Sequence, residues 1–310
     1  MDTGADTLYS HDVAVAVIAK FYALIARLYG PNVGLEYPPA VGWPQLTSDL
    51  CDKFRMTPEA FDLVCHIPYF RHPPFIMFDC RPHRYVDDVF IPLSGVKEED
   101  DGNEDEARGY PPHIFPLANN TSRNGCVLLI DVKHGVVIWY YIDGAPPMQG
   151  VPKPDAPCVF QQEDFEELYP DWRNVNDDDD DLDLLPWMEA PTYRIETFFA
   201  LAKEQLLRMN WLPEFELESD YTMQELKVYG EPNDEQRDRM QIMIDAGWPG
   251  DEIWDWRRAV EETKEWAYIR YKMRSANREI YKAKNVAQIR EGRKTVVHEK
   301  SGVNTEEKRG

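Results

Sequence analysis

Two apolar runs near the middle of the chain, residues 126–132 and 136–142, constrain the fold more than any other feature. Both runs are rich in β-branched and aromatic residues, and only the turn Lys133-His134-Gly135 separates them. Such runs on either side of a tight turn are typical of a β-hairpin, with Gly supplying the positive φ that the turn needs. We therefore expect an antiparallel sheet organised around this hairpin.

The composition provides ample material for a packed core around such a sheet. Hydrophobic residues make up 43% of the 310, and they include 9 Trp, 16 Tyr and 13 Phe. The formal net charge is −22 at pH 7. A field of that sign repels nucleic acid and anionic membranes. We therefore expect the main body of the protein to be soluble and to bind neither.

The cysteines and the first residues bear on the cellular compartment. The five cysteines are scattered, with no Cys-x-x-Cys pair, which favours reduced thiols. The chain starts with MDTGADTLYS, which lacks the basic region of a secretory signal, and the apolar run 13–29 is interrupted by Lys20 and Arg27. These patterns predict a cytoplasmic or nuclear protein that is not secreted and has no membrane span.

Helix signals lie on both sides of the hairpin. Apolar residues at helical spacing predict a first helix over about 10–29, which Gly30-Pro31 ends. Thr57-Pro58-Glu59 has the pattern of a helix start, with a capping Thr and Pro at the first helical position. A further helix is predicted over 195–207.

Strands and acidic tracts alternate between these helices. Strands are predicted over 75–78 and 85–91, ahead of the hairpin. The tracts near 97–106 and 174–185 are acidic and lack hydrophobic periodicity, so we interpret them as solvated insertions.

A basic arm closes the chain. Asn233 is expected to cap one helix, and Asp251 a long helix that extends toward Arg290. Between 270 and 300, ten Lys and Arg stand against three acids, a local charge of about +7. From residue 266 onward, small or apolar residues recur at alternating spacings of three and four, which resembles a heptad pattern. They are Trp266, Ile269, Met273, Ala276, Ile280, Ala283 and Ala287.

Together these elements predict an α+β protein, an antiparallel sheet with flanking helices and a long C-terminal helical extension. The predicted domains are residues 1–229, the α+β domain with the acidic insertions, and residues 230–310, a helical, basic extension with a disordered tail.

The central segment resembles the SUKH superfamily of cell-wall-synthesis regulators and toxin-immunity proteins. The resemblance rests on Phe115-Pro116-Leu117-Ala118, on Asn124-Gly125-Cys126-Val127-Leu128-Leu129-Ile130-Asp131 and on Gly135-Val136-Val137. It centres on residues 113–140, and the upstream segment Ile67-Pro68-Tyr69-Phe70 departs from the family pattern. The resemblance implies an α+β domain that binds other proteins and has no catalytic residues.

The residues that could carry chemistry favour no enzyme. The best metal-like set has one suitable pair, Cys80-x-x-His83, but its other members lack the spacing of a zinc site. That set is Cys65, His66, His72, Cys80 and His83. No common nucleophile, phosphate-loop or zinc-protease motif is present. We therefore predict no catalytic, cofactor-binding or metal-binding residue.

The function expected is that of a non-enzymatic protein-interaction or regulatory module resembling SUKH domains. Contacts to a protein partner are expected from the aromatic loop 37–44, the segment 69–75 and the arm 270–300. The residues singled out are Tyr37, Trp43, Tyr69, Phe70, Arg270, Arg274, Arg278 and Lys282. The alternatives are association with nucleic acid through the arm, which the overall charge disfavours, and an uncharacterised hydrolase. The sequence leaves the partner's identity and the oligomeric state open.

Overall fold

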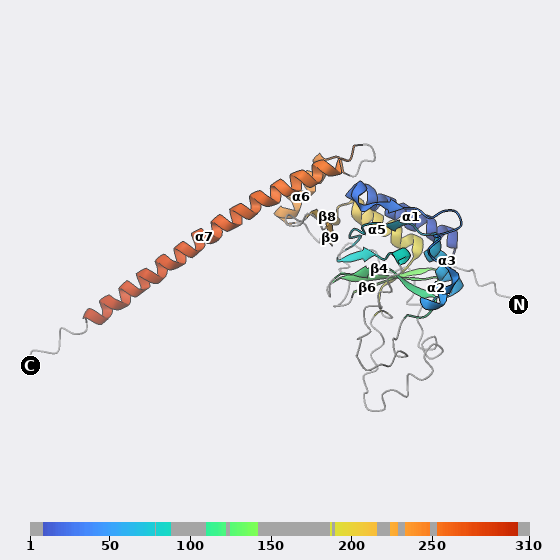
Figure 1. Ribbon diagram of the computed structural model, residues 1–310. Coiled ribbons are helices and arrows are strands. Elements are labelled where there is room, and N and C mark those ends of the chain that lie inside the picture. Colours follow the sequence, from blue (N-terminus) through green and yellow to red (C-terminus); the bar gives the residue numbers. More distant parts are fainter. Residues whose placement is uncertain are drawn as a thin grey trace, which may run out of the picture. The chain divides into compact units, whose positions relative to one another are not determined.

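The computed structural model describes residues 9–77, 79–87, 110–121, 125–141, 187, 190–215, 224–228, 233–248 and 253–302 (Figure 1). Both acidic insertions and the tail after residue 302 lie outside the described residues. The chain divides into two compact units, residues 1–259 and residues 260–310, and the second consists of the greater part of one long helix.

A five-stranded antiparallel sheet forms the centre of the first unit, and its strands follow one another in chain order. The strands are β3 (Cys80–Pro82), β4 (Ile114–Asn120), β5 (Cys126–Asp131), β6 (Val136–Tyr141) and β7 (Thr192–Arg194). In the hairpin, Cys126 pairs with Tyr141 and Asp131 with Val136. Gly135 in its turn has φ +69°, as the turn chemistry requires. The predicted hairpin and the α+β class are confirmed.

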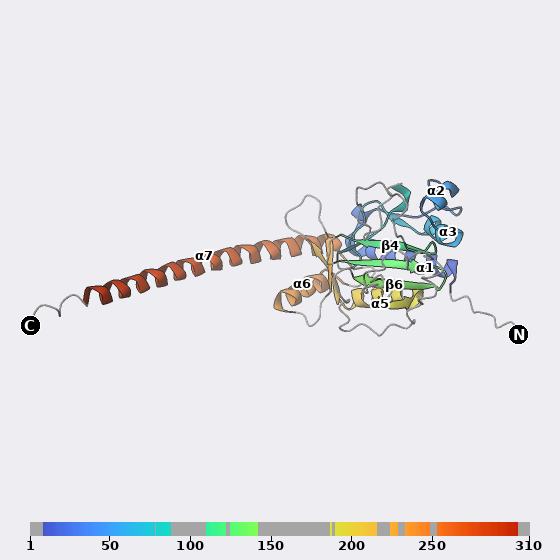
Figure 2. The same cartoon turned by 90° about the horizontal axis from the view of Figure 1, so that it is seen from below.

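Two helices lie side by side on one face of this sheet (Figures 1 and 2). They are α1 (His11–Tyr29), which ends before Gly30, and α5 (Ile195–Leu207). The ring centroid of Phe199 lies 5.3 Å from that of Phe21 on α1, and Phe198 lies 6.0 Å from Trp139 on β6. Both helices occupy the predicted positions because their apolar spacing matches the face they bury.

The opposite face of the sheet is also covered. Val127 and Leu129 of β5 and Val136 and Ile138 of β6 form an apolar cluster there with Trp187, and every residue of β5 is buried. Burial on both faces explains why the strand is a continuous apolar run rather than an alternating one. The sheet is therefore the shared core of the first unit.

Shorter elements complete the first unit. α3 (Pro58–His66) starts as predicted, with Thr57 Oγ1 accepting a hydrogen bond from the backbone N–H of Ala60 at 3.2 Å. The remaining elements are η1 (Pro31–Val33), α2 (Ser48–Lys53), η2 (Tyr85–Asp87), the pair β1 (Leu35–Glu36) and β2 (Tyr69–Phe70), the pair β8 (Trp211–Phe215) and β9 (Gln224–Val228), and α6 (Asp234–Asp245). Asn233 caps α6 through the expected reciprocal hydrogen bonds with Gln236.

The described parts of the strands predicted over 75–78 and 85–91 are not strands. Met77 makes only an isolated bridge to Cys80, and residues 85–87 form the 3₁₀ turn η2. Phe78 and residues 88–91 lie outside the described part of the chain. The edge strand is β3 instead, because its backbone pairs with the far end of β4.

The two compact units meet at residue 259. Tryptophans hold the residues just before it in the first unit. Trp248 Nε1 donates a hydrogen bond to the Leu207 carbonyl at 3.4 Å, and Trp254 Nε1 donates one to the Arg27 carbonyl at 3.2 Å. The long helix α7 (Trp256–Gly302) starts at Trp256, and the side chain of Asp255 accepts its first backbone N–H groups; the predicted cap, Asp251, lies outside the described residues.

Gly125 precedes β5 for a steric reason and not for a positive φ. A Cβ built on Gly125 would lie 2.4 Å from the carbonyl oxygen of Asp79 and 2.9 Å from the Asp79 Cβ. Real Cβ atoms do not approach backbone that closely, so this position has room only for Gly. The close approach holds the turn before β3 against the start of the hairpin.

We expect Gly125→Ala to destabilise the fold by about 2–3 kcal/mol, because backbone on one side must shift to admit the methyl group. Gly135→Ala is the matched control, and its left-handed φ of +69° alone should cost about 1 kcal/mol. Urea unfolding of both variants measures the difference. An equal loss in the two variants would contradict the steric explanation.

Candidate protein-interaction surface

Two of the residues predicted to contact a partner are in the core, which corrects that expectation. Tyr69 and Phe70 form β2, and each is only 1% exposed. The Tyr69 hydroxyl donates a hydrogen bond to the Val64 carbonyl at 2.6 Å, and the Phe70 ring packs 4.9 Å from that of Tyr22. Their aromatic area is used to join β2 to α1 and α3, so neither ring reaches the surface.

The aromatic loop at 37–44 is attached to the same core and presents one ring to solvent. Trp43 is partly buried, and its Nε1 donates a hydrogen bond to the Ile67 carbonyl at 2.8 Å. Its ring centroid lies 5.6 Å from that of Tyr69. Tyr37, in contrast, is 57% exposed. One exposed tyrosine is too small a surface to anchor a protein partner by itself.

The long helix α7 carries the largest exposed apolar set that the structure describes. Ile269 is 46% exposed, Met273 57% and Ile280 53%, and Ala276 between them is exposed as well. Their spacings of four, three and four residues place them along one face of a helix. We call these four residues, Ile269, Met273, Ala276 and Ile280, the α7 stripe.

Cations flank the α7 stripe. Arg270 lies with its guanidinium carbon 5.6 Å from the centroid of the Trp266 ring, and Lys272 Nζ lies 4.6 Å from that of Tyr268. Lys282 Nζ is paired with Glu279 at 2.8 Å. Over residues 269–282 there are five Lys and Arg and one acid, so this segment of the helix is positive. The predicted contact residues Arg270, Arg274, Arg278 and Lys282 all lie on this segment.

The metal-like set considered from the sequence does not converge. Cys80 is fully buried, and burial, reinforced by a hydrogen bond with the neighbouring Cys126, raises the pKa of its thiol. His83 is partly buried, and its Nδ1 lies 3.5 Å from Asn119 Nδ2, whereas His72 is exposed. Only His66 of that set joins a group of ligand-type side chains.

The structure instead brings together two groups of His and Asp that the sequence analysis did not identify. The first is His11, Asp62 and His66, and the second is His113, Asp131 and His134. The spacing Asp62-x-x-x-His66 on a predicted helix is a readable signal for the first group, because residues four apart share one face. No comparable signal marks His11, which is distant in sequence.

The second group fastens the hairpin turn. Asp131 is 1% exposed, and its Oδ1 accepts a hydrogen bond from the His134 backbone N–H at 3.1 Å. Its Oδ2 lies 2.6 Å from His134 Nδ1, and His113 Nε2 lies 3.9 Å from Oδ1. Both carboxylate oxygens are thus used inside the fold, which is the pattern of a buried turn residue.

Three of the described thiols have raised pKa values. Burial raises the pKa of Cys51, and burial together with the Asp62 carboxylate raises the pKa of Cys65 to about 11. With Cys80 shifted in the same direction, these three thiols stay protonated at neutral pH.

A comparison with protein-family models, curated proteins and solved structures finds no match to this chain. Among the described residues, no helix combines the length and the apolar character needed to cross a membrane.

His83 generates a prediction about acid stability. Burial lowers its pKa to about 4, well below the ordinary value of 6.5, so the folded protein holds a neutral ring. The unfolded chain binds a proton at this residue below about pH 6.5, which means that stability is lost as the pH falls toward 4. Between pH 7 and pH 4.5, the free energy of unfolding should therefore fall by about 2–3 kcal/mol less in His83→Gln than in the unaltered protein. Urea unfolding at both pH values measures it.

The exposed His72 provides the matched control, since His72→Gln should leave the pH dependence as it is in the unaltered protein. Equal pH dependence in the His83 variant and the unaltered protein would show that the ring titrates normally in the fold.

Proposed function

We propose that this protein is a non-catalytic interaction module that binds an acidic amphipathic helix of a partner protein along the α7 stripe. One observation carries the proposal: Ile269, Met273 and Ile280 lie exposed in a line on a long helix, with the cations Arg270 and Lys272 on either side of that line. Contiguous exposed apolar surface with a polar border is characteristic of protein-binding sites.

The spacing favours a helix as the occupant. Ile269, Met273, Ala276 and Ile280 follow the alternation of three and four residues that forms the seam of a coiled coil. A second helix laid along such a seam inserts its own apolar side chains between them. Burying Ile269, Met273 and Ile280 in this way would stabilise the complex by about 1.5–3 kcal/mol for each fully buried side chain.

The cations beside the seam suit an acidic partner helix. Arg270 and Lys272 occupy the positions beside the seam, where coiled coils place the charges that select partners. In a parallel pair of identical helices Lys272 would face Asn277, which offers no carboxylate, whereas Arg270 would face Glu265 and Lys284 would face Glu279. Glu or Asp at the corresponding positions of another helix would form ion pairs worth about 0.2–1 kcal/mol each.

Nucleic acid is the weaker candidate for the same surface. Phosphates would neutralise the cations, but they would leave Ile269, Met273 and Ile280 in water, and the chain as a whole carries a charge of −22. Protein binding uses both the apolar line and the charges. The resemblance to SUKH domains supports it too, since it implies an α+β domain that binds other proteins.

An intracellular location is part of the proposal. None of the four described cysteines forms a disulfide, and burial keeps Cys80 and Cys126 from solvent. Unbridged cysteines are usual in proteins of reducing compartments. We therefore infer a cytoplasmic or nuclear protein.

The test uses the full chain and two synthetic heptad peptides that share Leu at the seam. One peptide carries Glu and the other Lys at the positions beside the seam. We expect the Glu peptide to bind and the Lys peptide not to bind, because only the first complements Arg270 and Lys272. Fluorescence anisotropy of labelled peptide measures both affinities.

A triple variant, Ile269→Asp, Met273→Asp and Ile280→Asp, should weaken binding of the Glu peptide by about 100-fold or more, since it buries unpaired carboxylates in the seam. The matched control places three Asp residues outside the seam, as Tyr268→Asp, Tyr271→Asp and Ser275→Asp, and should retain most of the affinity.

Three other outcomes would contradict the proposal. Equal losses in the triple variant and its control would make the seam irrelevant. Dimerisation of the unaltered chain in sedimentation equilibrium, abolished by the triple variant, would make a second copy the occupant. Tight binding of an oligonucleotide that weakens steeply with salt and survives the triple variant would indicate nucleic acid.

A further inference from the structure

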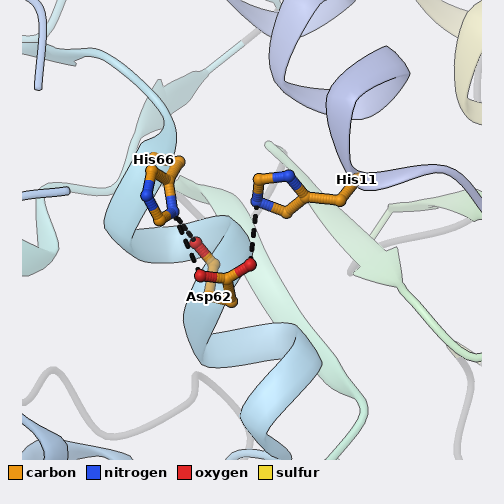
Figure 3. A group of neighbouring side chains, drawn as sticks. All are labelled: His11, Asp62 and His66. Carbon is orange, nitrogen blue, oxygen red and sulfur yellow. Dashed lines mark hydrogen bonds and ion pairs between the residues drawn. The ribbon is translucent and has the colours of Figure 1, made fainter. Parts of the chain in front are cut away.

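His11, Asp62 and His66 converge at the surface of the first unit (Figure 3). His11 is the first residue of α1, and Asp62 and His66 lie one turn apart on α3. His11 Nε2 lies 3.2 Å from Asp62 Oδ2, and His66 Nδ1 lies 3.2 Å from Asp62 Oδ1. Two elements far apart in the sequence therefore point three ligand atoms at one small region.

These separations suit a tetrahedral zinc ion. Zinc binds His nitrogen and carboxylate oxygen at about 2.0–2.1 Å, so neighbouring ligand atoms of a tetrahedral site lie about 3.3 Å apart. The two His–Asp distances of 3.2 Å are already close to that value, and all three ligand atoms lie within 4.8 Å of one another. We propose that His11, Asp62 and His66 bind Zn²⁺, with solvent as the fourth ligand.

The ring orientations agree with this assignment. The His11 and His66 rings stand nearly perpendicular, at 85°, with their centroids 5.3 Å apart, so neither stacks on the other. His11 Nδ1 lies 3.3 Å from Asp12 Oδ1, which places a carboxylate behind the ligating Nε2. A carboxylate in that position orients a metal-binding imidazole and strengthens it as a ligand.

His66 can offer its Nδ1 to the ion. That atom lies 2.8 Å from the backbone carbonyl of Asp62, to which it donates a hydrogen bond, so binding zinc at Nδ1 breaks this bond and places the ring proton on Nε2. Nε2 lies beside Gly42, where an added Cβ would come within 3.4 Å of it. Gly42 thus leaves space for the ring in the position that the site requires.

Neighbouring groups define the ligand set as two His and one Asp. Cys65 adjoins His66 in sequence, but its thiol points to the Leu46 carbonyl, 3.9 Å away. The carboxylates of Asp12 and Asp62 make the site attractive to a cation.

The exposure of the three side chains leaves room for solvent on the ion. They are 29%, 55% and 27% exposed for His11, Asp62 and His66. The second His–Asp group differs in this respect, because both oxygens of the buried Asp131 are engaged with its own turn. The ion would join the start of α1 to α3, and binding to the folded state alone would raise the melting temperature.

The experiment titrates the full chain, freed of metal with a chelator, with ZnCl₂ in an isothermal calorimeter. We expect one equivalent to bind. His11→Gln, Asp62→Asn and His66→Gln should each lower the affinity by about 100-fold or more, because each removes one of three protein ligands. Asp12→Asn should lower it by about 10-fold, since it alters only the orientation of His11. His72→Gln and His113→Gln are the controls and should bind as the unaltered chain does.

CoCl₂ provides an independent reading, because cobalt in a tetrahedral site absorbs visible light far more strongly than octahedral cobalt. We expect the strong absorption in the unaltered chain and its loss in His66→Gln. The melting temperature of each metal-free variant, compared with that of the metal-free unaltered chain, shows that the fold persists.

Absence of zinc binding by the unaltered chain would overturn the proposal. So would unchanged affinity in the double variant His11→Gln, His66→Gln, or loss of binding in His113→Gln alone, which would place the ion at the hairpin turn instead. Weak absorption typical of octahedral cobalt would also count against the tetrahedral site.

Discussion

The pairing of β5 with β6 is the interaction on which the rest of the first unit depends. Trp139 of β6 is fully buried, and its ring contacts Phe198 on α5 and Trp211 on β8. The same hairpin presents Val127 and Leu129 to the other face of the sheet. If the strands slipped by one residue, every one of these side chains would change face. The buried Asp131 at the end of β5 fixes the turn and thereby the register.

The hairpin could be predicted because its information is local. Two β-branched runs and a Gly turn specify a pair of strands without reference to the remainder of the chain. The edge strands could not be predicted in this way. β3 and β7 have three residues each, and they are strands only because β4 and β6 offer them a free backbone edge. The same applies to Tyr69 and Phe70, an aromatic pair that suggests a surface loop until β1 and α1 cover it.

The two candidate sites differ in the same way, because one lies on a single helix and the other depends on a contact between distant segments. The spacing of Ile269, Met273 and Ile280 is visible in the sequence because a single helix carries all of them. The site of His11, Asp62 and His66 depends on the docking of α1 against α3, and no local pattern encodes that contact. Sequence analysis therefore identified the arm, although it emphasised the cations rather than the apolar line between them. It missed the histidine and aspartate group altogether.

A zinc ion held by two His and one Asp has an open position, which in other settings is a place for catalysis. The surroundings here favour a structural role. A metal-bound water becomes a strong nucleophile chiefly where a dry, shaped cavity orients the substrate and excludes bulk water. Asp62 is 55% exposed, so solvent has direct access to the ion. A surface ion that ties the first residue of α1 to α3 is instead suited to holding two helices together, which is compatible with the proposed role in binding another protein.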